Sequence, residues 1–219
     1  MYPDEFPELR LWPAERKVLA GRMGRWFSKM DSMIGETMRD GIERGFVVCG
    51  DPRDPERNVV KECMGDSCQI ILPKCEKYDF HGTFHTHPTG SASLSIGDIV
   101  AAFAKNVDVA CVGSRRSFLL EGGVDAEGNE VVCMVINRGH PDYGRVRKKV
   151  LEFYDREYKP VRDHIFERYR RGEDIEEEYR KKYFELRRRL MELIEDVASF
   201  EYPIGSYYGT SYRLDRLKI

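Results

Sequence analysis

The residues best suited to chemistry lie in one short window, GTFHTHPTGSASLSIGD, which runs from Gly82 to Asp98. His85 and His87 stand two residues apart in a β-like run, and side chains at that spacing point to the same face of a strand. Ser95 and Asp98 follow, at the point where an apolar helical pattern begins. Two imidazoles and one carboxylate leave one position open on a tetrahedral zinc ion, which is typical of catalytic rather than structural zinc sites.

Each of these residues also has a purely structural interpretation. A histidine pair in a strand is more often part of the core or the surface than a pair of metal ligands. Ser-x-x-Asp ahead of an apolar helix is a capping box, in which the two side chains bond backbone N–H groups. Because both patterns fall in one window, where the end of a strand faces the start of the next helix, we favour a metal site formed by His85, His87 and Asp98.

A hydrolytic metal site also needs a base that takes a proton from water. Glu43 comes just before the apolar run Gly45–Gly50, so its side chain stands at the mouth of a buried strand. The alternative is a solvated acid at a helix end, since glutamates are mostly exposed. We favour Glu43 as the base because of the strand that follows it.

Helices and strands alternate around these residues. Apolar residues at spacings of three and four predict helices over Ala14–Asp40, with its methionines in the core, and over Ile96–Lys105. Apolar and β-branched runs predict strands over Gly45–Gly50, Asn58–Glu62, Gln69–Leu72, Phe80–His87, Val107–Val112, Ser117–Glu121 and Glu130–Ile136. Asp125–Asn129 predicts a turn. This order indicates an α/β or α+β domain.

The composition shifts after about residue 140, where charge dominates and apolar residues fall at helical spacing. One stripe runs from Val146 to Ile165, with Pro160 breaking or kinking it, and a second runs from Ile175 to Val197. With the turn Arg171-Gly172 between them, they predict a helical hairpin that packs on the first domain or offers its stripe to a partner or a second copy of the chain.

The shift in composition also suggests the domain boundaries. We expect the candidate site in a domain over residues 1–140, which begins with an irregular proline-containing arm over about residues 1–13. The helical extension then covers residues 141–219 and ends in an aromatic, extended tail from Glu201.

Composition excludes several classes of function. The chain of 219 residues has no apolar run near the ~20 residues that span a bilayer, and its first residues lack the pattern of a signal peptide, so we expect a cytoplasmic protein. A net charge of −2 gives no reason to expect nucleic acid as a partner. Charged residues at 34%, with one glutamine, follow a thermophile tendency.

The six cysteines form no recognisable zinc motif. Reduced, partly buried thiols are expected in a cytoplasmic protein. A hyperthermophilic source would make a disulfide among Cys63, Cys68 and Cys75 plausible, because such organisms are an exception to that rule.

The candidate site residues together resemble the motif of the JAMM/MPN+ metalloproteases. That motif is a glutamate followed by His-x-His-x7-Ser-x2-Asp, and here its positions are filled by Glu43, His85, His87, Ser95 and Asp98. The segments GIERG and FHTHPT look especially like those of deubiquitinating members. The resemblance covers about residues 20–137 and leaves the helical extension outside.

The resemblance implies both a fold and an activity. The fold would be a central mixed β-sheet flanked by helices, of the cytidine-deaminase-like kind. His85, His87 and Asp98 would hold one zinc ion per chain, Glu43 would activate a zinc-bound water and then protonate the leaving amine, and Ser95 would donate a hydrogen bond to the oxyanion. Substrates would be conjugates of ubiquitin, or of ubiquitin-like or sulfur-carrier proteins, and the cut would follow the C-terminal glycine of that protein. Its extended C-terminal tail would bind as an added strand at a sheet edge.

Three alternatives remain at this point. A non-catalytic MPN scaffold would use the hairpin to assemble a complex, although such members lack the zinc ligands. A non-haem iron oxygenase also uses two histidines and a carboxylate, but commonly as His-x-Asp/Glu with a distant histidine. The RadC-type, DNA-associated proteins share the His-x-His-Pro-x-Gly pattern, whereas Glu43 and the near-neutral charge favour the protease branch.

Overall fold

The computed structural model describes residues 23, 26–50, 59–66, 70–73, 75, 80–88, 92–119 and 125–201. These residues form two compact units. The first takes in the described residues up to Leu94, those of Val107–Ile136 and those from Ser199 to Glu201, and the second consists of Ser95–Asn106 and Asn137–Ala198. The predicted N-terminal arm and the tail beyond Glu201 lie outside the described residues. The boundaries 1–140 and 141–219 stay a prediction, and the contacts group Ser95–Asn106 with the C-terminal helices.

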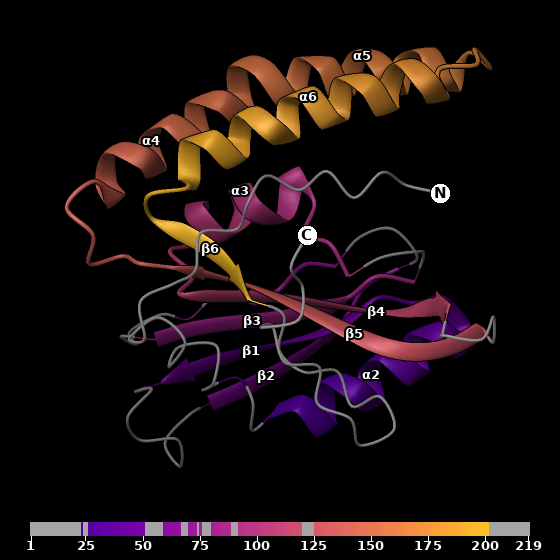
Figure 1. Ribbon diagram of the computed structural model, residues 1–219, viewed down its shortest axis with the longest axis vertical. Helices are drawn as coiled ribbons and strands as arrows, with labels where there is room; N and C mark the ends of the chain where they lie inside the picture. Colours follow the sequence, from indigo (N-terminus) through magenta and orange to yellow (C-terminus); the bar gives the residue numbers. More distant parts are fainter. Residues whose placement is uncertain are drawn as a thin grey trace. The chain divides into compact units, whose positions relative to one another are not determined.

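A six-stranded mixed sheet forms the first unit, in the order β2-β1-β3-β4-β5-β6 (Figure 1). Its strands are β1 (Arg44–Gly50), β2 (Val59–Met64), β3 (Phe80–Thr86), β4 (Val109–Leu119), β5 (Asp125–Ile136) and β6 (Ala198–Glu201). β1 runs antiparallel to both of its neighbours, β3 and β4 are parallel, and β4 and β5 are antiparallel. The predicted mixed α/β architecture is confirmed.

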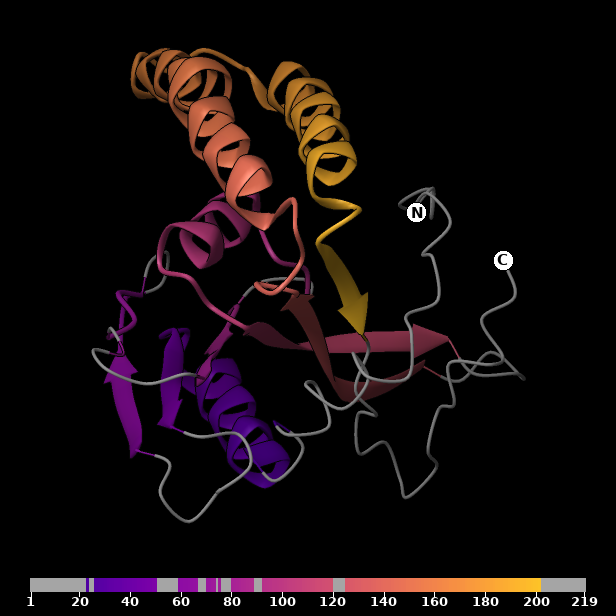
Figure 2. The same ribbon diagram turned by 90° about the vertical axis from the view of Figure 1, so that its left-hand side faces the viewer.

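Helix α2 (Phe27–Asp40) lies along one face of this sheet (Figure 2). Its buried residues pack on apolar side chains of the four central strands, and together they make up the core: Met30, Met33, Ile34, Phe46, Val48, Phe84, Val109, Cys111, Val131, Cys133 and Val135, with Met23. The methionines are core residues, as predicted. The helix ends at Asp40 because Gly41, at φ 73°, adopts the left-handed conformation that glycine tolerates.

Several strand predictions need correction. Residues 70–72 are irregular rather than a strand. The two strands predicted over Val107–Val112 and Ser117–Glu121 are one strand, β4, and the turn predicted at Asp125–Asn129 lies inside β5. The backbone pairing explains both differences. Residues 125–129, where a turn was predicted, pair with residues 115–119 of β4 and so extend the ladder between two long strands. Local turn propensity is overridden there by cross-strand pairing.

The expectation of reduced thiols is wrong for four of the cysteines. Cys49 is bonded to Cys75, and Cys111 to Cys133. The second pair joins directly opposed residues of β4 and β5, a proximity that sequence spacing does not reveal. Cys63 belongs to neither disulfide and donates to the Gly45 carbonyl at 3.4 Å, whereas Cys68 lies outside the described residues.

The second unit consists of helices α3 (Ile96–Ala104), α4 (Tyr143–Phe153), α5 (Lys159–Arg170) and α6 (Glu176–Ile194). The predicted hairpin is confirmed, with its turn at Gly172 (φ 78°) and with α6 returning alongside α5 and α4 (Figure 1). Ion pairs join Arg168 of α5 to Glu178 of α6, and Arg189 of α6 to Glu157, which lies between α4 and α5. No helix within the described residues combines the length and the hydrophobicity of a transmembrane span.

Pro160 does not stop the first helix of this hairpin. A π-helical turn, Tyr154–Tyr158, connects α4 to α5, and Pro160 lies in the first turn of α5. Proline is tolerated there because the first N–H groups of a helix have no partner within it. The predicted break is therefore a local change of helical pitch.

Candidate metal centre

The two histidines converge at the end of β3, as their spacing predicts. The Nε2 atoms of His85 and His87 lie 3.1 Å apart, and His85 is only 5% exposed. His87 follows the last residue of the strand and is held by β4, because its N–H donates to the Gly113 carbonyl at 2.9 Å and its carbonyl accepts the Ser114 hydroxyl at 3.0 Å. The role of Ser114 could not be predicted from the sequence, because it depends on the parallel pairing of β3 with β4.

Asp98 lies in the first turn of α3 and forms the capping box with Ser95. The Ser95 Oγ accepts the Asp98 N–H at 3.1 Å, and the Asp98 Oδ2 accepts the Ser95 N–H at 2.7 Å. The capping interpretation is thus confirmed. It does not compete with metal binding, because a carboxylate has two oxygens and about four acceptor positions, of which the cap uses one.

His85, His87 and Asp98 form a group that could hold a metal ion. One donor atom of each residue lies within 4.8 Å of the other two, and they are the one such group among the described residues. A zinc ion about 2.1 Å from its nitrogen and oxygen ligands holds neighbouring ligands about 3.4 Å apart in a tetrahedron. The histidine pair, at 3.1 Å, is close to that spacing. Two imidazole nitrogens and a carboxylate oxygen therefore fit the donor set of zinc.

Glu43 precedes β1 and is buried, with only 7% of its surface exposed. The solvated-acid alternative is therefore wrong. Its N–H donates to the Asp66 carbonyl and its carbonyl accepts the Gly65 N–H, both at 2.9 Å, which fixes its backbone. β1 and β3 pair Gly45 with His85, and extending this antiparallel register by two residues sets Glu43 across from His87. Residues two apart share a face, so Glu43 belongs to the face that carries both histidines.

Gly45 explains why β1 can lie so close to the histidine strand. A Cβ atom at this position would lie 2.5 Å from the Phe84 carbonyl oxygen, 2.9 Å from the Leu72 Cδ2 and 3.2 Å from the His85 Cβ. A Cβ atom essentially never lies within 3.0 Å of a backbone atom, and the Phe84 carbonyl oxygen cannot swing away, so only glycine fits beside His85 without a shift of the strands. The glycine of the Glu-x-Gly segment is thus a packing requirement of the site.

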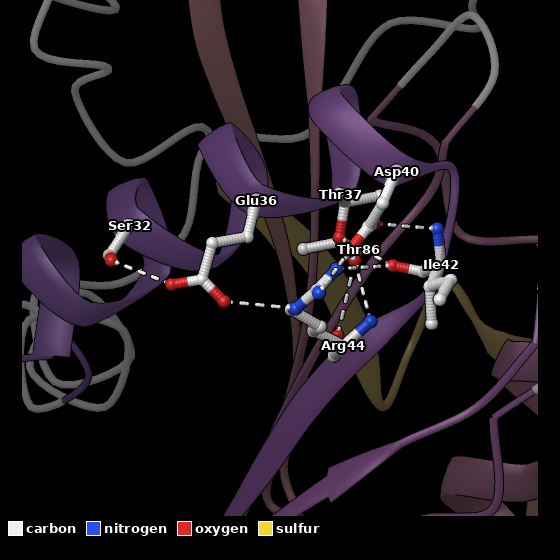
Figure 3. Close-up of polar contacts among 7 residues, drawn as sticks. All are labelled: Ser32, Glu36, Thr37, Asp40, Ile42, Arg44 and Thr86. Atoms are coloured by element: carbon white, nitrogen blue, oxygen red, sulfur yellow. Dashed lines mark hydrogen bonds and ion pairs between the residues drawn. The ribbon is translucent and has the colours of Figure 1, made fainter.

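A buried polar network ties the Glu43 segment to β3 between the two histidines (Figure 3). Thr86 is fully buried. Its Oγ1 accepts the Arg44 N–H at 2.9 Å and lies 2.7 Å from the Thr37 Oγ1, and Thr37 donates to the Ile42 carbonyl at 2.8 Å. Because Thr86 alternates with the histidines along the chain, these bonds hold β3 from the face opposite the imidazoles.

The Arg44 side chain extends the same network to α2 (Figure 3). Its guanidinium bonds Asp40 at 2.5 and 2.8 Å and Glu36 at 2.9 Å. These hydrogen bonds from Arg44 lower the pKa of Asp40 to about 2. Sequence reasoning missed Thr37, Thr86 and Arg44, since the first two are unremarkable threonines in the sequence and meet only when α2 packs on the sheet.

Comparison with protein-family models, with curated proteins and with solved structures finds no match to this chain. The case for a function therefore depends on the residues themselves and on their geometry.

Proposed function

We propose that this chain is a zinc-dependent peptidase or isopeptidase of the JAMM/MPN+ kind, which cleaves after the C-terminal glycine of ubiquitin or of a ubiquitin-like or sulfur-carrier protein. One observation carries the proposal: His85, His87 and Asp98 form a possible donor group, and the register of β1 with β3 sets the buried Glu43 across from His87. The resemblance of the motif to that family supports the choice of metal and substrate class.

Each residue has a distinct role in this reaction. His85, His87 and Asp98 would hold a zinc ion, which would keep one coordination position open and would make the proton of a water bound there acidic near neutral pH. Glu43 accepts that proton and later donates it to the amine that leaves. The Ser95 hydroxyl donates a hydrogen bond to the oxygen of the scissile carbonyl, where negative charge develops. In the capping box the Ser95 Oγ is an acceptor, so its own proton remains for this bond.

The test is cleavage by Glu43→Gln, which keeps the size and polarity of the side chain but cannot accept the proton. The zinc-loaded chain is incubated with fusions of candidate modifiers that end in Gly-Gly, and mass spectrometry locates the cut. We expect the variant to lose at least about 100-fold in kcat/KM. Glu62→Gln is the matched control, because Glu62 is an exposed residue of β2 that pairs with Lys29.

Three outcomes separate the possibilities. Retained turnover by Glu43→Gln would contradict the assigned base. A wild-type chain that binds zinc but cuts none of the fusions would contradict the substrate class. A chain that binds no zinc would favour the scaffold alternative, in which the hairpin serves assembly.

A further inference from the structure

The helix that carries Asp98 is held by the C-terminal helices at both of its ends. α3 is a short helix of nine residues, and short helices owe most of their stability to tertiary contacts. It belongs to the same compact unit as α4, α5 and α6. The contacts at its two ends show what those helices do for it.

At the N-terminus of α3, Tyr183 of α6 accepts a backbone hydrogen bond. The Ile96 N–H donates to the Tyr183 hydroxyl at 3.3 Å. The first N–H groups of a helix have no partner within it, and Ser95 caps the Asp98 N–H rather than that of Ile96. The Ile96 side chain is fully buried, so losing this partner would leave a partly buried donor unsatisfied.

At the C-terminus of α3, Arg147 of α4 binds the last carbonyl groups. Its Nε donates to the Phe103 carbonyl at 2.9 Å and its Nη2 to the Ala104 carbonyl at 3.1 Å. A cation is favourable there because the carbonyl end of a helix is negative. Asn106 lies two residues after the end of α3 and has a left-handed backbone conformation, with φ at 54°. Its side-chain oxygen accepts a hydrogen bond from the Tyr143 hydroxyl of α4 at 3.0 Å, which holds this residue in place.

We propose that Tyr183 is a positioning residue for the Ser95–Asp98 capping box, and that the C-terminal helices thereby set the metal affinity of the chain. Asp98 lies two residues after Ile96, within the same helical turn, so the bond from Tyr183 restrains the backbone that bears the carboxylate. The rings of Tyr179 and Phe184 lie 5.7 and 6.3 Å from that of Tyr183 and hold it in place. This inference rests on the proposed metal site.

The test compares Tyr183→Phe, which removes only the hydroxyl, with Tyr179→Phe, the same change one turn earlier on α6. Co²⁺ affinity is measured by titration, together with the visible spectrum of the bound ion and the exchange of the Ile96 amide proton in the metal-free chain. For Tyr183→Phe we expect about threefold to tenfold weaker Co²⁺ binding, an altered spectrum and faster exchange, and for Tyr179→Phe no change. Arg147→Lys, which keeps the charge but loses one of two bonds, should weaken binding in the same direction.

The outcomes distinguish this inference from the function on which it rests. Wild-type Co²⁺ affinity and wild-type exchange in Tyr183→Phe would overturn the positioning role and leave the proposed metal site intact. A wild-type chain that binds no Co²⁺ or Zn²⁺ would overturn both. If Tyr183→Phe fails to fold, unchanged Co²⁺ binding by Arg147→Lys would overturn the inference.

Discussion

Replacing Gly45 with alanine tests whether the close approach of β1 to β3 builds the site. The added Cβ would lie 2.5 Å from the Phe84 carbonyl oxygen and 3.2 Å from the His85 Cβ. The carbonyl belongs to the backbone of the neighbouring strand and cannot rotate away, whereas Leu72, at 2.9 Å, has a flexible end. The two strands must therefore separate, and His85 must move with β3.

The expected cost follows from this overlap. Overpacking of a buried position costs about 1–3 kcal/mol, which outweighs the ~0.5–1 kcal/mol that alanine gains over glycine within a regular element. Gly35→Ala is the matched control, because Gly35 lies in α2 with nothing within 4 Å of its added Cβ. That variant should gain about 0.5–1 kcal/mol. The two substitutions are chemically identical and should differ in sign.

Urea unfolding at pH 7 gives both free energies of unfolding, and Co²⁺ titration gives the effect on the site. We expect Gly45→Ala to lower the free energy of unfolding and the Co²⁺ affinity together, and Gly35→Ala to lower neither. If Gly45→Ala were as stable as the wild type and bound Co²⁺ equally well, the packing of Gly45 against His85 would have no bearing on the site.

Two further predictions concern the network behind the histidines. Thr86→Val keeps the shape of a fully buried side chain but leaves the Arg44 N–H without its 2.9 Å acceptor. The free energy of unfolding in urea should therefore fall by about 1–3 kcal/mol, and an unchanged unfolding midpoint would contradict the role of the network. The pKa of Asp40 is lowered from 3.8 to about 2, so its bond with Arg44 stabilises the fold above pH 4 and this stabilisation is lost as the pH falls to 2. Wild type should therefore exceed Asp40→Asn in stability at pH 5, with the gap closing by pH 2, and a gap independent of pH would contradict this.

Local patterns in the sequence were enough to predict the convergent histidines, the helix that starts after Ser95 and the hairpin with its turn at Gly172. Each depends on residues a few positions apart, where strand and helix periodicity decide the geometry. Ser95 and Asp98 show that one pattern can be compatible with two interpretations, because the capping box is present and its Asp98 also belongs to the group that could hold a metal ion.

The features that the sequence did not reveal depend on contacts between distant segments. The disulfides Cys49–Cys75 and Cys111–Cys133 follow from the arrangement of the strands, and Thr86 acquires its role only when α2 packs on the sheet. The bond from Ile96 to Tyr183 likewise links residues far apart in the chain. From the sequence we placed the domain boundary near residue 140, where the composition changes. In the structure, hydrogen bonds and packing group α3, which precedes that boundary, with the helices that follow it.

The zinc content of the chain after dialysis tests the central claim most directly. Wild type and Glu43→Gln should each retain about one zinc ion per chain, while only the wild type cleaves a Gly-Gly fusion. A wild-type chain that retains no zinc, or a Glu43→Gln variant that cleaves as fast as the wild type, would contradict the account.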